Sequence, residues 1–242
     1  MMRVLMIVPA YNEQENIVET INQIRSLEQE EEYSVDYIVI NDGSTDNTQQ
    51  ICDENNIKCL ELIQNLGIGG AVQTGYIYAY LNNYDIAVQF DGDGQHDINS
   101  LKDLITPIIS DECDFVVGSR FVNGNSAFQS TRMRRVGIKW LSKVIKMFSG
   151  ITVKDPTSGF RAANRRCIQI LAHSYPVDYP EPEAIVMLAK KNVRIQETQV
   201  NMFEREGGAS SINMWRSVYY MFKVTIAIIC TSFQKTVMSE EV

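Results

Sequence analysis

The first 120 residues alternate short apolar runs with helical patterns, and this alternation restricts the chain to very few folds. Apolar runs with the length of buried strands occupy residues 4–8, 37–40, 59–63, 86–90 and 115–118. Helical periodicity fills the intervals at residues 13–27, 47–55, 70–81 and 100–109. Strands joined through helices by short connections pair side by side in the same direction. The pattern therefore predicts an α/β fold with a mainly parallel central sheet flanked by helices.

Composition agrees with a globular protein that buries a sizeable core. The 242 residues are 45% hydrophobic and 21% charged, which excludes disordered and fibrous classes. The five cysteines form no C-x-x-C pair, and residues 2–10 are too short an apolar run for a secretory leader, so we expect structural thiols in a reducing, cytosolic environment. No uncharged apolar run reaches the roughly 18 to 20 residues of a transmembrane helix.

Polar residues follow each of the first four predicted strands. Residues 11–13 follow the first, residues 41–44 the second, Asn65 the third and residues 91–93 the fourth. The carboxyl ends of parallel strands meet at one edge of a sheet, which is where open α/β sheets bind ligands. We expect these polar groups to form one binding site.

Asp91-Gly92-Asp93 is the strongest single signal for chemistry. Two carboxylates one residue apart at a strand end suit Mg²⁺ or Mn²⁺, which prefer oxygen ligands. Gln95 and His96 lie within reach of the same ion. The alternative is an acidic surface turn, because D-x-D alone is a common sequence.

Asp42 ends the second strand and can accept hydrogen bonds from a bound base or sugar hydroxyl, whereas Asp46 is expected to cap the helix that follows. The glycines of residues 67–70 lack the G-x-G-x-x-G spacing of a dinucleotide site. The sequence thus argues against a nicotinamide-dependent dehydrogenase.

Charge is distributed unevenly along the chain. Residues 120–166 hold eleven basic side chains and one acid, so they carry +10, while the other 195 residues carry −18. The net charge of −8 and the pI near 4.9 argue against a nucleic-acid partner. The basic segment predicts an anionic ligand or surface.

Two segments have the pattern of amphipathic helices. Within residues 132–148 one stripe is basic and another apolar; the basic stripe comprises Arg132, Arg135, Lys139, Lys143 and Lys146, and the apolar one Met133, Trp140, Val144, Met147 and Phe148. This pattern is typical of a helix in a membrane interface, and a solvated basic face packed on a core is the alternative. A second apolar stripe comprises Trp215, Tyr219, Phe222, Ile226 and Ile229. This stripe could contact a membrane, a small membrane protein or a second copy of the chain. Alternatively, the helix that carries it is buried in the fold.

Six motifs taken together resemble family 2 glycosyltransferases with the GT-A (nucleotide-diphospho-sugar transferase) fold. The motifs are Pro9–Glu13, Asn41–Thr48, Asn65–Gly75, Asp91–His96, Gly118–Arg120 and Asp155–Arg161. The nearest likeness is to the polyprenyl-phosphate branch, which includes dolichyl-phosphate mannose synthase and bacterial undecaprenyl-phosphate sugar transferases. The resemblance covers residues 3–211, which we take as the catalytic domain, residues 1–211. Residues 212–242 are then a C-terminal amphipathic helix that binds membrane or a protein partner.

The resemblance implies roles for individual residues. Nucleotide-sugar contacts fall on Pro9, Tyr11, Glu13, Asp42, Asn65, Gly67, Asp91, Gly92, Asp93, Arg205 and Ser210. The metal ligands are Asp91, Asp93 and Gln95. Catalytic roles fall on Asp91, Asp93, Asp155, Glu183 and Arg205, with Glu183 as an acid near the sugar. The residues implied to bind the acceptor phosphate are Arg120, Arg132, Arg134 and Arg135. Two positions depart from the family pattern, because Asn41 replaces an aspartate and Ser211 replaces a lysine.

The predicted activity is an inverting, metal-dependent transfer from UDP-glucose or UDP-N-acetylglucosamine to polyprenyl (undecaprenyl) phosphate at the cytoplasmic face of the cell membrane. The product would donate its sugar to a cell-surface polysaccharide. One alternative is transfer to a saccharide hydroxyl, with Asp155 or Glu183 as the base. Another is a non-catalytic protein that binds nucleotide-sugars.

Overall fold

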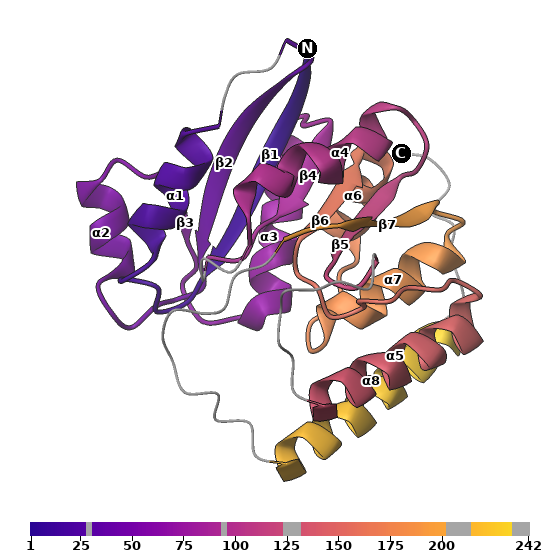
Figure 1. The fold of residues 1–242 in the computed structure, drawn as a ribbon. Coiled ribbons are helices and arrows are strands. Elements are labelled where there is room, and N and C mark those ends of the chain that lie inside the picture. Colours follow the sequence, from indigo (N-terminus) through magenta and orange to yellow (C-terminus); the bar gives the residue numbers. More distant parts are fainter. Residues whose placement is uncertain (28–30, 93–95, 123–131, 202–213, 234–242) are drawn as a thin grey trace.

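The computed structural model describes residues 1–27, 31–92, 96–122, 132–201 and 214–233, and in residues 132–134, 214–218 and 220 it describes only the backbone. The strands are β1 (Met2–Ala10), β2 (Tyr33–Asn41), β3 (Cys59–Glu61), β4 (Ile86–Gln89), β5 (Phe115–Ser119), β6 (Arg161–Asn164) and β7 (Ile195–Gln199). The helices are α1 (Ile17–Arg25), α2 (Thr48–Glu54), α3 (Gly67–Leu81), α4 (Leu101–Ile109), α5 (Arg132–Ser149), α6 (Arg165–His173), α7 (Pro180–Lys190) and α8 (Met214–Phe233), with a short 3₁₀ turn at Ile98–Ser100 (Figure 1).

The strands form one sheet in the order β3-β2-β1-β4-β6-β5-β7. β1 pairs in parallel with β2 and β4, β2 with β3, and β5 with β7. β6 alone among these strands runs antiparallel to its neighbours β4 and β5. The predicted mainly parallel sheet is confirmed, and it contains one strand that reverses direction.

Both faces of the sheet are covered, which accounts for the uninterrupted apolar sequence of β1. Leu5 and Ile7 face a core formed with α3, α6 and α7, while Val4, Met6 and Val8 face a second core formed with α1 and α4. All five side chains are fully buried, as expected for a central parallel strand. The two cores hold the carboxyl ends of β1, β2 and β4 in fixed positions.

The first helix begins at Ile17, four residues later than the periodicity predicts. The residues before it form a loop that is bonded to the loop after β2: the amide of Asn12 donates to Ser44 Oγ (3.0 Å) and the amide of Thr45 donates to Asn12 Oδ1 (2.8 Å). Asn12 has a φ of 57°, a left-handed conformation that asparagine tolerates. The helical periodicity therefore continues into a loop that is not helical, because its hydrogen bonds join the loops that follow β1 and β2.

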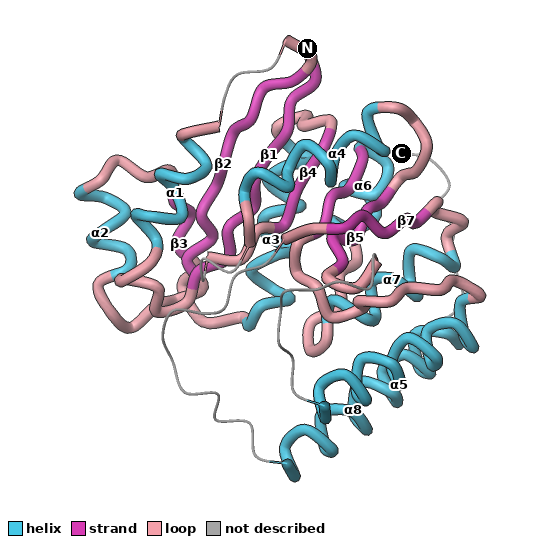
Figure 2. The backbone as a smooth tube through the Cα atoms, in the orientation of Figure 1, coloured by secondary structure: helices cyan, strands magenta, loops and turns pink. Residues whose placement is uncertain are grey.

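Helices α5 and α8 run side by side and pack together against α7 (Figure 2). Trp140 Nε1 donates to Thr225 Oγ1 at 3.1 Å, and the backbone of Gly137 lies against Met221. Val144 of the predicted apolar stripe is buried here, whereas Trp140 and Met147 are exposed. Among the described residues, no helix is both long and apolar enough to span a bilayer.

Candidate active site

The loops after β1 and β2, the start of α3 and the end of β4 enclose a cleft of about 440 Å³, a volume typical of small-molecule sites. It is lined by Pro9, Ala10, Tyr11, Glu13, Asp42, Asn65, Gly67, Ile68, Ala71, Asp91 and Gly92. These include every residue predicted to contact the nucleotide-sugar that lies in the described part of the chain. Asp93, Gln95, Arg205 and Ser210 lie outside the described residues.

Asp42 is buried at the end of β2, and one of its oxygens is already engaged. The amide of Leu66 donates to Asp42 Oδ1 at 2.7 Å, which joins the loop after β2 to the start of α3. Gly43 makes this approach possible, because a Cβ there would lie 2.8 Å from the backbone nitrogen of Asn65. The second carboxylate oxygen of Asp42 is the one that a ligand in the cleft can use.

Asn41, which replaces an aspartate of the family pattern, supports the loop and does not line the cleft. Its Oδ1 accepts a hydrogen bond from the amide of Ser44 (3.1 Å), and its Nδ2 donates to Gln49 Oε1 (3.0 Å). A carboxylate at position 41 could make the first bond but could not donate the second. The substitution therefore fits this loop and leaves Asp42 as the acidic group at the end of β2.

Asp46, expected to cap the second helix, bonds to its first residue, although the N-cap position itself is occupied by Asn47, whose side chain makes no cap bond. Asp46 Oδ1 accepts hydrogen bonds from the amide (3.0 Å) and hydroxyl (2.5 Å) of Thr48, the first residue of α2. The amide of Glu13 in turn donates to Thr48 Oγ1 at 3.0 Å. Asp46 thus acts through Thr48 to hold the loop that carries Tyr11 and Glu13 beside the cleft.

Asp91 follows β4 and is the one of the three predicted metal ligands that lies in the described part of the chain. Its Oδ2 lies 3.0 Å from His96 Nε2, and its Oδ1 lies 3.4 Å from Gln89 Nε2. Burial raises the pKa of Asp91, but hydrogen bonds from His96 and Gln89 and the charge of Arg161 outweigh it, so the pKa lies below its ordinary value. An ionised carboxylate at a cleft suits a hard divalent cation. The described residues alone contain no cluster of three or more His, Cys, Asp or Glu side chains arranged to bind a metal.

Glu183 and Glu181, two residues apart at the start of α7, have different surroundings. Thr231 Oγ1 of α8 donates to Glu183 Oε2 at 3.3 Å, so the acid expected near the sugar contacts α8. Glu181 instead interacts with Gln89 and with the charges of Arg161 and Asp91; burial raises its pKa, and Arg161 offsets part of the rise. Sequence reasoning missed Glu181, although the repeated P-E of this motif offered both candidates.

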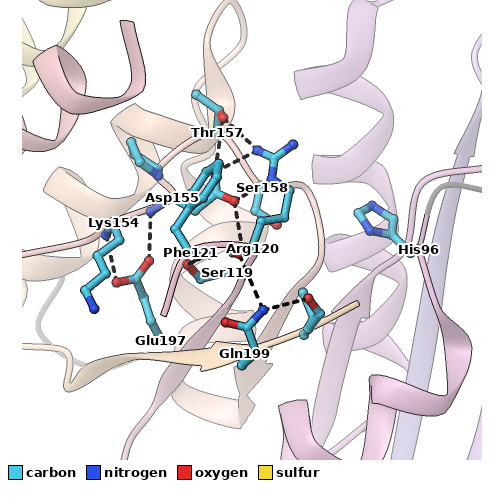
Figure 3. Close-up of polar contacts among 12 residues, drawn as sticks. His96, Ser119, Arg120, Phe121, Lys154, Asp155, Thr157, Ser158, Glu197 and Gln199 are labelled. Carbon is cyan, nitrogen blue, oxygen red and sulfur yellow. Dashed lines mark hydrogen bonds and ion pairs between the residues drawn. The ribbon is translucent and has the colours of Figure 1, made fainter. Parts of the chain in front are cut away.

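Arg120 and Asp155 bind each other (Figure 3). Arg120 Nε donates to Asp155 Oδ2 (2.6 Å) and Nη2 to Oδ1 (2.7 Å), and both side chains are almost completely buried. The Arg120 amide and the Thr157 hydroxyl give each carboxylate oxygen a second hydrogen bond. This geometry favours a structural role for the pair over the acceptor-binding and catalytic roles expected from sequence.

The other three arginines expected at the acceptor phosphate belong to the first turn of α5. Arg135 is exposed, and the side chains of Arg132 and Arg134 lie outside the described part. Lys139, Lys143 and Lys146 continue the exposed basic stripe along the helix. Where side chains are described, the basic residues of this helix therefore lie on its exposed surface.

The family model described as Glycosyl transferase family 2 matches residues 6–170. The chain belongs to glycosyl transferase family 2. The expected enzyme class, a glycosyltransferase, is confirmed by this match, and the match includes the described cleft residues.

Relatives within family 2 include enzymes of the polyprenyl-phosphate branch. The chain is 32% identical over 222 residues to the UDP-N-acetylglucosamine–dolichyl-phosphate N-acetylglucosaminyltransferase of Methanococcus voltae, with 84% of this chain and 86% of that protein covered. It is 27% identical over 226 residues to the undecaprenyl-phosphate mannosyltransferase of Micrococcus luteus, with 88% of each covered. The resemblance to this branch is therefore confirmed.

Solved structures agree on the GT-A fold. The glucosyl-3-phosphoglycerate synthase of Mycobacterium tuberculosis, crystallised with Mn²⁺ and UDP-glucose, superposes with a TM-score of 0.68 at 17% identity, covering 96% of this chain and 79% of that one. At this identity the likeness concerns the fold alone.

Proposed function

We propose that this family 2 enzyme transfers a sugar from a nucleotide-sugar, with inversion, to a polyprenyl phosphate. The observation that carries the proposal is the combination of a cleft lined by Asp42 and Asp91 with an exposed basic helix. The names of the two relatives, one acting on dolichyl phosphate and one on undecaprenyl phosphate, support the acceptor class.

The donor would lie in the cleft with its nucleoside at the β1–β2 end. Tyr11 is half exposed over the cleft and offers an aromatic face for a base, while Asp42 offers a free oxygen for a base N–H or a ribose hydroxyl. We favour a UDP-sugar, UDP-glucose or UDP-N-acetylglucosamine, because the relative from Methanococcus voltae is named for UDP-N-acetylglucosamine.

The diphosphate end would need a divalent cation. Asp91, together with Asp93 and Gln95, would hold Mg²⁺ or Mn²⁺, and the ionised state of Asp91 fits that role. When bound, such an ion neutralises charge on the leaving diphosphate. Arg205 and Ser210 would add contacts to the same phosphates.

The acceptor phosphate is an anion at neutral pH and needs no general base. One of its oxygens would form the new bond to the anomeric carbon on the face opposite the breaking bond to the nucleotide diphosphate, and the configuration inverts. Arg132, Arg134 and Arg135 would bind and orient that phosphate, because guanidinium groups match phosphate oxygens in pairs.

A lipid acceptor requires contact with a membrane surface. Among the described side chains of the α5–α8 pair, the large exposed apolar ones are Val136, Trp140, Met147, Tyr219, Phe222, Ile226 and Phe233. The exposed lysines of α5 lie beside them, which is the arrangement of helices in an anionic lipid interface. We place the enzyme at the cytoplasmic face, where its product would supply sugar for a cell-surface polysaccharide.

Transfer to a saccharide hydroxyl has less support. It needs a general base, and of the two bases expected for it, Asp155 has both oxygens bonded to Arg120 and Thr157, while Glu183 contacts Thr231 of α8. A non-catalytic role has less support still, because the cleft keeps its acidic residues at the ends of β2 and β4.

The test is a panel of UDP- and GDP-sugars offered with a short-chain polyprenyl phosphate, with and without Mn²⁺ or Mg²⁺. We expect metal-dependent transfer from a UDP-sugar, and a large loss of transfer in the double variant Arg134→Ala with Arg135→Ala. If that variant transferred sugar to lipid phosphate at the wild-type rate, the acceptor assignment would be wrong. Transfer to a saccharide in the absence of lipid phosphate would favour the alternative.

A further inference from the structure

Sequence alone places His96 within reach of the predicted ion, but in the structure its ring lies behind Asp91 and its Nε2 contacts that carboxylate. Its side chain is 3% exposed, and its ring packs against those of Phe90 and Phe160, with centroid distances of 5.6 and 5.1 Å. The two phenyl rings also contact each other, with centroids 5.6 Å apart. Nε2 is 3.0 Å from Asp91 Oδ2. A histidine enclosed in this way contacts the carboxylate from the protein side.

The hydrogen-bond geometry assigns the proton of this ring to Nε2. Nδ1 is buried and has no hydrogen-bond partner among the described residues. A proton on Nδ1 would leave a buried donor without an acceptor among those residues, whereas a proton on Nε2 is donated to a carboxylate. The ring thus fixes Oδ2 of Asp91, while Oδ1 accepts a long hydrogen bond from Gln89 (3.4 Å). A carboxylate oxygen has two lone pairs, so each oxygen keeps one that these bonds do not use.

Gly159 holds the same carboxylate from another side. A Cβ at this position would lie 2.3 Å from Asp91 Oδ2, so the carboxylate occupies the space that any larger residue would need. The next residue, Phe160, covers the ring of His96. The dipeptide before β6 therefore shapes both Asp91 and the histidine that bonds to it.

We propose that His96 is a positioning residue, which fixes the plane of the Asp91 carboxylate so that its remaining lone pairs face a divalent cation. The inference rests on the proposed metal role of Asp91. A carboxylate that turns freely about χ2 loses rotational freedom when it binds a cation, whereas one held by a hydrogen bond has already lost it. Groups that orient metal ligands in this way typically contribute about 10- to 100-fold to metal affinity.

The experiment measures Mn²⁺ binding to the full-length enzyme in the presence of UDP, from the loss of the electron paramagnetic resonance signal of free Mn²⁺. His96→Phe keeps an aromatic ring packed against Phe90 and Phe160 but has no donor, and we expect affinity to fall about 10- to 100-fold. His96→Gln carries its amide nitrogen near the position of Nε2 and should restore most of the affinity. The control is His173→Gln, at the other histidine, which is exposed and bonded to the carbonyl of Gln169.

Kinetics separate positioning from packing. We expect His96→Phe to raise the Mn²⁺ concentration needed for half-maximal transfer, while the rate at saturating Mn²⁺ stays much closer to wild type. Thermal unfolding without metal reports the packing contribution. Should His96→Phe fail to fold, His96→Asn replaces it, because the shorter amide cannot reach Asp91 from the Nε2 position.

Asp91→Asn serves as the reference. Wild-type Mn²⁺ affinity in His96→Phe, or equal weakness of the Phe and Gln variants, would overturn the positioning role. If His96 proves to have no positioning role but Asp91→Asn loses Mn²⁺ binding, the proposed metal site at Asp91 still stands. Wild-type affinity in Asp91→Asn would overturn the metal site and the positioning role together.

Discussion

At the scale of single residues, Asp42 is the clearest test of the donor cleft. Asp42→Asn keeps a carbonyl that can accept the Leu66 amide but replaces the second oxygen with a donor. A hydrogen bond to a charged group contributes about 1.5 to 3 kcal/mol, so we expect UDP affinity to fall about 10- to 100-fold. Isothermal titration calorimetry with UDP measures this change.

The control for that variant is Asp103→Asn, which removes an exposed carboxylate from α4. It should bind UDP as the wild type does. Wild-type UDP affinity in Asp42→Asn would mean that the nucleoside is recognised elsewhere in the cleft.

Gly159 offers a second residue-scale test. Gly159→Ala introduces a Cβ where Asp91 Oδ2 now lies, so either the carboxylate or the loop must move. We expect metal-supported transfer to fall at least about tenfold, in line with the loss of a group that orients a metal ligand. The neighbouring Ser158→Ala is the matched control, because Ser158 Oγ is buried without a hydrogen-bond partner in the described structure. Equal activity in the two variants would contradict the expectation.

Residue identity predicted part of this site. The polar residues at strand ends were sufficient to predict that Asp42 and Asp91 line the cleft, because parallel strands bring their carboxyl ends together. It could not distinguish Glu181 from Glu183, since a helix start turns two nearby side chains in different directions. Nor could it show that His96 bonds to Asp91 from behind, because that contact depends on the packing of Phe160.

At the scale of elements, the Arg120–Asp155 pair joins the end of β5 to the segment before β6. Removing one partner leaves a buried charge uncompensated, so Asp155→Ala should lower the free energy of unfolding by about 3 to 5 kcal/mol. Urea denaturation measures the effect. Asp111→Asn, at the exposed Arg194–Asp111 pair, should change the unfolding curve little. A stable Asp155→Ala protein that has lost transfer would instead indicate a catalytic aspartate.

Periodicity predicted the strands and helices of the first half closely, because apolar runs and helical patterns alternate there without interruption. It did not predict that β6 runs antiparallel, since four residues of sequence carry no signal of direction. Nor did it separate the buried from the exposed members of the apolar stripe on α5. Val144 is buried, whereas Trp140 and Met147 are exposed, because α5 packs against α7 and α8, and contacts with such distant segments leave no local pattern.

At the scale of the whole molecule, the distribution of charge predicts binding to anionic membranes despite a net charge of −8. Co-sedimentation with vesicles rich in anionic lipid should detect it. Binding should weaken as the salt concentration rises, because salt screens the attraction between exposed lysines and anionic lipid. The screening length is about 10 Å at 0.1 M salt and shortens as salt is added. The double variant Phe222→Ser with Ile226→Ser should reduce binding at least about tenfold, since it removes two apolar side chains from the contact.

Ile77→Ser with Leu81→Ser is the matched control for vesicle binding. These exposed apolar residues belong to α3, away from the α5–α8 pair, and their loss should leave binding unchanged. Equal losses in both double variants would indicate non-specific adsorption.

The reversed direction of β6 limits which changes of length the chain tolerates. Arg161 pairs with Gln89, so the segment that precedes β6 arrives at the same sheet edge as the end of β4. That segment is held at Asp155 by Arg120 and at Gly159 by its contact with Asp91. One residue inserted between these two points would have to bulge outward or displace the carboxylate. Relatives that keep this activity should therefore vary freely in length at the turn between α2 and β3, and hardly at all between positions 155 and 161.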